Sequence, residues 1–267
     1  MIEGRFEGRI AAVIGGGSGM GAAISRRLSS EGAHVYVVDL DQNSASAIGD
    51  QIREAGGKAT ARCLDAVQVS ELKDLYDEID AEHGVLHVLH HQVGMPGAGG
   101  IDISESDWEM CVEVNIKSPF YASTLAFDLL RKAEKKASVT LTASTSALVG
   151  SPFSPLYSLT KGALVAYGRS LALVGAADGI RVRFCRHPDA AYLLWARTRS
   201  RHRRPEDRFH FLDDSVGKGG PTRGDRRCGR LPGERRRLVR NRYCYTSRWW
   251  NRREVADRPR RMKLTVR

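Results

Sequence analysis

Residues 9–21, RIAAVIGGGSGMG, join a short apolar run to five glycines within seven residues. The apolar run predicts a buried strand, and residues 19–30 then carry apolar side chains at helical spacing. Glycines between a strand and a helix allow a tight turn, whose backbone can approach a pyrophosphate group at the helix N-terminus. The stretch therefore predicts the first strand, turn and helix of a dinucleotide-binding βαβ unit.

The alternation of strand and helix patterns continues from this unit to about residue 182. Strands are expected at 9–14, 34–39, 59–64, 85–91, 138–142 and from 179, and helices at 19–30, 43–55, 69–83, 105–133 and 155–177. This alternation indicates right-handed crossovers and a parallel sheet. The predicted fold class is α/β, a Rossmann-like doubly wound parallel sheet in a single domain, with ligands at the carboxyl ends of the strands.

An acidic residue, Asp39, ends the second predicted strand, 18 residues after Gly21. A carboxylate at this place can accept hydrogen bonds from both ribose hydroxyls of NAD and would repel a 2′-phosphate. The simpler alternative is that Asp39 caps the helix that follows it.

A serine, a tyrosine and a lysine form the second motif. Tyr157 and Lys161 are four residues apart in a predicted helix and so project from one face, while Ser144 follows the fifth predicted strand. A free phenol has a pKa of about 10, and a nearby ammonium group favours the phenolate. Such a tyrosine can exchange a proton with a substrate oxygen, to which the serine hydroxyl can also hydrogen-bond.

On these motifs, residues 8–182 resemble the short-chain dehydrogenase/reductase family. The family's TGxxxGxG turn matches Ile14 to Gly21, with Ile14 in place of threonine, and its NNAG motif is replaced by His91-Gln92-Val93-Gly94. The resemblance implies a seven-stranded Rossmann-like sheet, a homo-oligomer (tetramer or dimer), NAD as cofactor, and hydride transfer between the nicotinamide and a secondary alcohol or ketone. The alternative from another class is a catalytically silent dinucleotide-binding module with a basic arm.

The resemblance also implies a role for each matching residue. Tyr157 would be the acid/base, Lys161 would lower its pKa and bind the nicotinamide ribose, Ser144 would orient the substrate oxygen, and Asn115 would hold a water in the proton relay. The implied catalytic set is Asn115, Ser144, Tyr157 and Lys161. The implied cofactor-binding set is Gly15, Gly19, Met20, Gly21, Asp39, Asp65, Gly94, Tyr157 and Lys161.

Other patterns limit the remaining function classes. No run of about 18 apolar residues exists, so a membrane-spanning helix is not expected. The five cysteines are scattered without a CxxC pair, which is typical of the reducing cytoplasm and argues against a structural zinc site. His83, His87, His90 and His91 are close in sequence, but Gly84 interrupts any helix through them, and His90 and His91 should face opposite sides of a strand. No metal site is therefore predicted.

The composition changes abruptly near residue 183. Residues 1–182 hold 16 Lys+Arg and 22 Asp+Glu, whereas residues 183–267 hold 26 and 9, and 24 of those 26 are arginine. The predicted organisation is a cofactor-binding and catalytic domain over 1–182 and an atypical arginine-rich segment over 183–267. The segment lacks the family's substrate lid, helix and final strand, and its charged runs break every apolar pattern.

Three interpretations of the arginine-rich segment compete: a nucleic-acid-binding tail, a disordered basic extension, and a shifted reading frame. The genetic code favours the third. Trp has the single codon TGG and Asn codons begin with A, so Trp249-Trp250-Asn251 gives Gly-Gly when each codon starts one base later. The same shift permits Thr-Gly-Thr-Ala-Ile-Pro-Val-Asp before Gly-Gly, which is typical of the family's last strand. We expect the frame to change at about 183–190, and no nucleic-acid partner.

Overall fold

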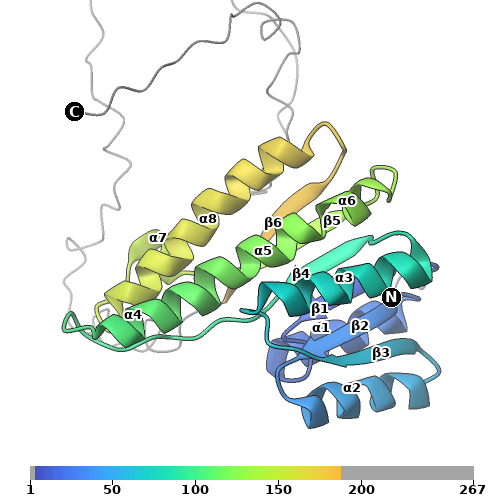
Figure 1. The fold of residues 1–267 in the computed structure, drawn as a ribbon, viewed down its shortest axis with the longest axis horizontal. Coiled ribbons are helices and arrows are strands. Elements are labelled where there is room, and N and C mark those ends of the chain that lie inside the picture. Colours follow the sequence, from blue (N-terminus) through green and yellow to red (C-terminus); the bar gives the residue numbers. More distant parts are fainter. Residues whose placement is uncertain (1–3, 188–267) are drawn as a thin grey trace, which may run out of the picture. The chain divides into compact units, whose positions relative to one another are not determined.

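The computed structural model describes residues 4–187, whose six strands form one parallel sheet in the order β3-β2-β1-β4-β5-β6 (Figure 1). The strands are β1 (Ile10–Ile14), β2 (His34–Asp39), β3 (Lys58–Cys63), β4 (Val88–His91), β5 (Ser138–Ser144) and β6 (Arg181–His187). The chain proceeds outward from β1 to β3 and then returns to the other side of β1 with β4. This arrangement confirms the predicted Rossmann-like parallel α/β fold, with its switch point between β1 and β4.

Helices lie in two layers, one on each face of the sheet. The helices are α1 (Gly19–Ser30), α2 (Gln42–Glu54), α3 (Val69–His83), α4 (Glu105–Val112), η1 (Glu113–Lys117, a π-turn), α5 (Ser118–Leu125), α6 (Phe127–Arg131), α7 (Ser146–Val149) and α8 (Pro155–Gly175). One apolar core packs α3, α5, α6 and α8 against β1, β2, β4, β5 and β6. A second core packs α1 and α2 against the opposite face.

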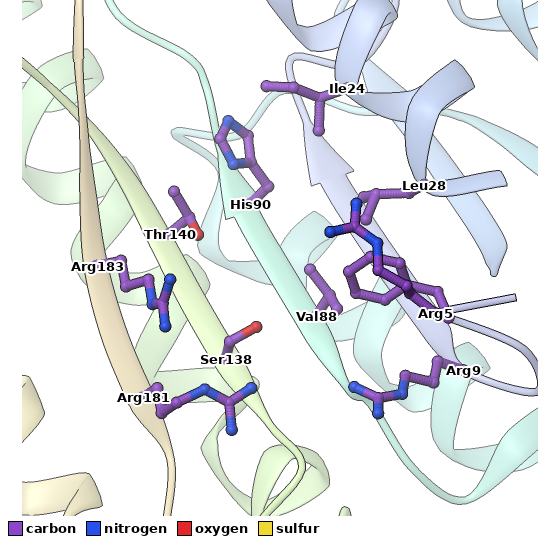
Figure 2. A pocket seen from close by; sticks show the side chains of 11 residues that line it. Arg5, Arg9, Ile24, Leu28, Val88, His90, Ser138, Thr140, Arg181 and Arg183 are labelled. Atoms are coloured by element: carbon purple, nitrogen blue, oxygen red, sulfur yellow. The ribbon is translucent and has the colours of Figure 1, made fainter. Parts of the chain in front are cut away.

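The second core stops near β4, so half of one sheet face is not covered by the described helices. Val88 is its only member from β4, β5 or β6. Beyond it the same face carries polar side chains and forms a pocket of about 300 Å³, shown in Figure 2. The pocket is lined by Arg5, Phe6, Arg9, Ile24, Leu28, Val88, His90, Ser138, Thr140, Arg181 and Arg183. Parallel sheets are normally covered on both faces, so this half lacks a layer within residues 4–187.

The long helix expected over 105–133 is wrong in one respect: it is interrupted twice. The π-turn η1 separates α4 from α5, and α6 begins after a break at Ala126. Pro119 accounts for the first interruption, since it has no amide hydrogen to donate to the carbonyl of Asn115. Single π-turns inside helices occur frequently at functional sites, and this one carries Asn115.

The remaining boundaries differ from expectation by a few residues. The strand expected at 85–91 covers only Val88–His91, and β5 extends to Ser144, so that serine is the last residue of its strand. The predicted domain boundary at 182 falls within β6. The arginine-rich residues from 188 onward, together with the seventh strand that the resemblance implies, lie outside the described residues.

Residues 4–187 also bear on two kinds of feature, membrane-spanning helices and metal sites. None of their helices is both long and apolar enough to cross a bilayer. No group of three or more of their His, Cys, Asp and Glu side chains is arranged to hold a metal ion. Gly84 does end α3, in the left-handed conformation, directly after His83.

Candidate active site

The glycine turn after β1 is held tightly against β2. The amides of Gly15 and Gly16 both donate to the carbonyl of Val38, at 2.8 and 2.7 Å, and Gly15 has φ +81°. A Cβ atom on Gly21, in the first turn of α1, would lie 1.8 Å from the carbonyl oxygen of Gly15. The helix therefore begins in direct contact with the turn, and only glycine fits there.

The N-terminus of α1 has no side-chain cap. Ser18 occupies the N-cap position, but its side chain makes no capping hydrogen bond. The first amides of an α-helix have no partner within the helix. Because α1 begins at the carboxyl end of β1, these amides lie where such sheets bind ligands, and an anionic group can accept hydrogen bonds from them. Gly19 and the 37% exposed Met20 are the first two residues of this helix.

Asp39, at the end of β2, is fixed beside the same turn. Its Oδ2 accepts a 2.9 Å hydrogen bond from the amide of Gly17, and its Oδ1 accepts one of 3.3 Å from the amide of Asp41. Asp41 is the residue that caps α2, through the amides of Asn43 and Ser44. The alternative that Asp39 is the helix cap is therefore wrong.

Asp65 follows the neighbouring strand β3. Leu64, directly before it, donates its amide to the carbonyl of Asp39 at 3.1 Å, which joins the two strand ends. The Oδ1 atom of Asp65 accepts from the amide of Val67 at 3.1 Å. The structure thus places Asp65 along the same edge of the sheet as Asp39 and the glycine turn.

Lys161 is a buried cation at the centre of the carboxyl edge. It is 2% exposed, and its Nζ donates to the carbonyl of Thr142 in β5 at 2.9 Å. Burial lowers the pKa of this ammonium group to about 8, with a smaller opposing effect of Cys111. The group therefore carries its charge at neutral pH and loses it just above.

Tyr157 lies on the same face of α8 as Lys161, as the spacing predicts. The lysine Nζ is 5.7 Å from the centroid of the tyrosine ring. The tyrosine is in the first turn of the helix, where its amide donates to the Oγ of the N-cap residue Ser154 at 3.3 Å. The capped helix start fixes the backbone of Tyr157 next to the buried ammonium group.

Ser144 is 1% exposed at the end of β5. Its Oγ accepts hydrogen bonds from the amide and the hydroxyl of Ser146, at 3.2 and 2.9 Å. Two donors on one hydroxyl oxygen leave its own hydrogen available for a further acceptor. Sequence reasoning did not assign this supporting role to Ser146, because nothing in the spacing shows that a serine two residues on turns back.

Asn115, in the π-turn, joins three segments that are distant in sequence. Its amide exchanges two 2.9 Å hydrogen bonds with the backbone of Met95, one from the amide of Met95 and one to its carbonyl. Its Nδ2 also donates to Thr160 at 3.1 Å. The side chain thus clamps the loop after β4 to α8, and the water relay implied by the resemblance stays a prediction.

Gly94 lies between the lysine and the asparagine. A Cβ atom at this position would be 2.8 Å from Lys161 Nζ and 3.2 Å from Asn115 Oδ1. Similarly, a Cβ on Gly15 would be 3.0 Å from Val93 Cγ2. Glycine at these two points lets the backbone approach its neighbours closely. The predicted site residues come together at one edge of the sheet.

Comparison with known proteins gives one family. The profile for short chain dehydrogenases matches residues 9–188. Cyclopentanol dehydrogenase of Comamonas sp. (strain NCIMB 9872) is 31% identical over 180 residues, which are 67% of this chain and 72% of that protein. Meso-2,3-butanediol dehydrogenase of Serratia marcescens is 30% identical over 179 residues, 67% of this chain and 70% of that protein.

A solved structure agrees with these relatives. The structure of 7 alpha-hydroxysteroid dehydrogenase complexed with NADH and 7-oxo glycochenodeoxycholic acid is similar with a TM-score of 0.64 and 26% identity. The similarity covers 67% of this chain and 70% of that one. Together with the parallel sheet and the glycine turn, these matches establish that the chain belongs to the short-chain dehydrogenase family.

Proposed function

We propose that this member of the family is an NAD(H)-dependent oxidoreductase that interconverts a secondary alcohol and a ketone. The observation that carries the proposal is the buried ammonium group of Lys161 beside the Tyr157 ring, at the carboxyl edge of the sheet. The cofactor class is supported by the family and by the NADH in the similar structure. The uncapped start of α1 and the glycine-lined edge fit a dinucleotide.

A nicotinamide group, when bound, supplies or accepts the hydride. The residues of this chain then manage the proton and the substrate oxygen. Tyr157 exchanges a proton with that oxygen as the general acid or base. The Lys161 cation stabilises negative charge on the phenol oxygen, and Ser144 donates a hydrogen bond to the same substrate oxygen.

Asp39 favours NAD over NADP. Its carboxylate is held beside the glycine turn by hydrogen bonds from the amides of Gly17 and Asp41, where it would accept hydrogen bonds from a bound ribose. A fixed carboxylate accepts from ribose hydroxyls and repels a 2′-phosphate. We expect NADPH to bind at least about tenfold more weakly than NADH, a difference of about 1.4 kcal/mol.

Exposed apolar side chains near Ser144 favour a partly apolar substrate. Leu148, Val149 and Phe153 are 46%, 37% and 48% exposed, and they lie between Ser144 and Tyr157 in sequence. Small alcohols or ketones are the expected substrates. A homo-oligomer and a cytoplasmic location stay predictions.

The substitution Tyr157→Phe tests the function. It removes only the phenol oxygen, so turnover of an alcohol panel should fall by about 10³-fold while NADH fluorescence still reports binding. Tyr167→Phe is the matched control: it removes a hydroxyl on the same helix that pairs with Ser123 at 2.6 Å, and turnover should persist.

The wild type and the two variants together distinguish an oxidoreductase from a module that only binds the dinucleotide. An oxidoreductase loses turnover in Tyr157→Phe but not in Tyr167→Phe. A catalytically silent dinucleotide-binding module binds NADH and turns over no alcohol even in the wild type. Loss of both binding and turnover in Tyr157→Phe would count against the role proposed for this tyrosine.

A further inference from the structure

His91 is a buried imidazole at the point where the sheet meets the cofactor edge. It is the last residue of β4 and pairs in register with Ile14 of β1 and Leu141 of β5. It therefore lies beside the strand that leads into the glycine turn, three residues before Gly94. Its side chain is 1% exposed, and the mechanism proposed above gives it no role.

The imidazole is bonded to the helix that follows the π-turn. His91 Nε2 lies 2.8 Å from the Oγ of Ser118, which is also 1% exposed. Ser118 is the first residue of α5 and comes directly after η1, the turn that carries Asn115. The turn is thus held on two sides: Asn115 fixes it to the loop after β4 and to α8, and Ser118 fixes it to the end of β4.

The charge state of His91 suits this place. Burial lowers its pKa to about 3, and the neighbouring Lys161 and His90 act in the same direction. The ring is therefore neutral at pH 7 and does not repel the Lys161 ammonium group. A neutral imidazole has one donor and one acceptor nitrogen, so either orientation of the Ser118 hydroxyl satisfies the pair.

A serine 2.8 Å from a histidine also has the spacing of a nucleophile and its base. Here, however, the two side chains are 1% exposed and join the end of β4 to the start of α5. Burial instead makes the pair a fixed link, since an unpaired polar group at this depth would be costly.

We infer that His91 is a positioning residue, which holds the π-turn through Ser118 and so keeps Asn115 and Lys161 aligned across Gly94. The inference rests on the proposed function for its kinetic effect. The link itself does not, since it is present without substrate or cofactor. A small misplacement of catalytic groups lowers kcat far more than it lowers substrate affinity.

The test uses the full 267-residue chain with His91→Leu, His91→Gln, Ser118→Ala and the double variant His91→Leu/Ser118→Ala. We expect His91→Leu to lower kcat by about tenfold with KM nearly unchanged, because alignment and not binding is lost. The amide of glutamine can replace the ring nitrogen, so His91→Gln should recover most of kcat. In urea unfolding of the cofactor-free chain, the double variant should be no less stable than His91→Leu alone.

Tyr76→Phe is the control for a purely structural effect. The Tyr76 hydroxyl donates to the carbonyl of Ala122 at 2.7 Å, so this variant also removes a buried hydrogen bond to α5, four residues farther along. It should lower the unfolding midpoint and leave kcat unchanged. If His91→Leu and Tyr76→Phe lower kcat equally, if His91→Leu leaves kcat unchanged, or if the two single effects on unfolding are additive, the inference is wrong.

The proposed function is judged separately in the same series. NADH binding by the wild type and its loss of turnover in Tyr157→Phe decide that function. If the wild type binds NADH without turnover, the proposed function fails, and the unfolding series alone tests the link. Additive effects of His91→Leu and Ser118→Ala on unfolding would then overturn the inference.

Discussion

Two polar regions lie on the same sheet, and they are built differently. At the carboxyl edge, Asn115, Ser144 and Lys161 are 0%, 1% and 2% exposed, and each has at least one close hydrogen-bond partner. On the open face of β4, β5 and β6, Arg181 and Arg183 are exposed beside Ser138 and Thr140, their neighbours in register (Figure 2). The pocket is on the open face, but the buried, hydrogen-bonded polar side chains are at the carboxyl edge. Buried polar side chains with hydrogen-bond partners, and not the presence of a pocket, distinguish the candidate active site.

The open face also shows what the sheet lacks. A strand in a parallel sheet normally carries apolar side chains on both faces. On β6, Val182 and Phe184 pack into the core with α8, whereas Arg181 and Arg183 alternate with them on the other side. A cover for that side should be apolar, but the chain beyond residue 183 is rich in arginine. We therefore propose that the shifted reading frame inferred from the codons removed the covering layer.

The largest expected effect comes from restoring the frame. A gene in which codons from about 183–190 are read one base later should give a chain with a complete sheet. We expect the chain with the given sequence to fold more weakly and to show lower, but measurable, activity than the restored chain, because a domain has a net stability of only about 5–15 kcal/mol and this sheet face lacks a covering layer within residues 4–187. Sequencing of the gene across codons 175–260, followed by soluble yield and thermal unfolding of both chains, checks this.

The opposite outcome for the frame prediction is equally clear. If the chain with the given sequence is soluble, fully active and as stable as the restored chain, the prediction is wrong. The open face would then be a surface that the protein tolerates, and the comparison between edge and face would lose its explanation.

One added methyl group, at Gly94 on the carboxyl edge of the sheet, should lower activity strongly. Gly94→Ala places a Cβ atom 2.8 Å from Lys161 Nζ, which is buried and bonded to Thr142 and so has little room to move. We expect kcat/KM to fall by about 100-fold, about 2.7 kcal/mol. NADH titration and steady-state kinetics measure the loss.

Gly162→Ala is the matched control for Gly94. Gly162 follows Lys161 in the same helix, and a Cβ atom there meets nothing closer than the carbonyl oxygen of Ala147 at 3.8 Å. Alanine inside a helix is favoured over glycine by about 1 kcal/mol, so this variant should be active and slightly more stable. Equal losses of activity in both variants would contradict the geometry assigned to Gly94.

The residues at the carboxyl edge of the sheet could be predicted from the sequence better than the open face of β4, β5 and β6, for physical reasons. Glycine spacing and the four-residue separation of Tyr157 and Lys161 are local signals, and the structure brings these residues together as expected. The clamp from Asn115 to Met95 and Thr160 depends on a π-turn, whose only local signal is Pro119. The partner of His91 is 27 residues away, so only the folded chain reveals it.

The smallest expected effect is on the pH dependence of the free energy of unfolding, and it distinguishes the buried Lys161 from an exposed cation. Lys161 has a pKa of about 8 in the folded chain and 10.5 as the ordinary value. Between these values the unfolded chain binds more protons, so this group makes stability rise with pH, by up to about 1.4 kcal/mol per pH unit. Urea unfolding of the cofactor-free chain from pH 7.5 to 10 should show that increment in the wild type and not in Lys161→Met. Arg183→Gln removes an exposed charge on the open face and should keep this increase in stability with pH. If Lys161→Met also keeps the increase, burial of Lys161 is not its cause.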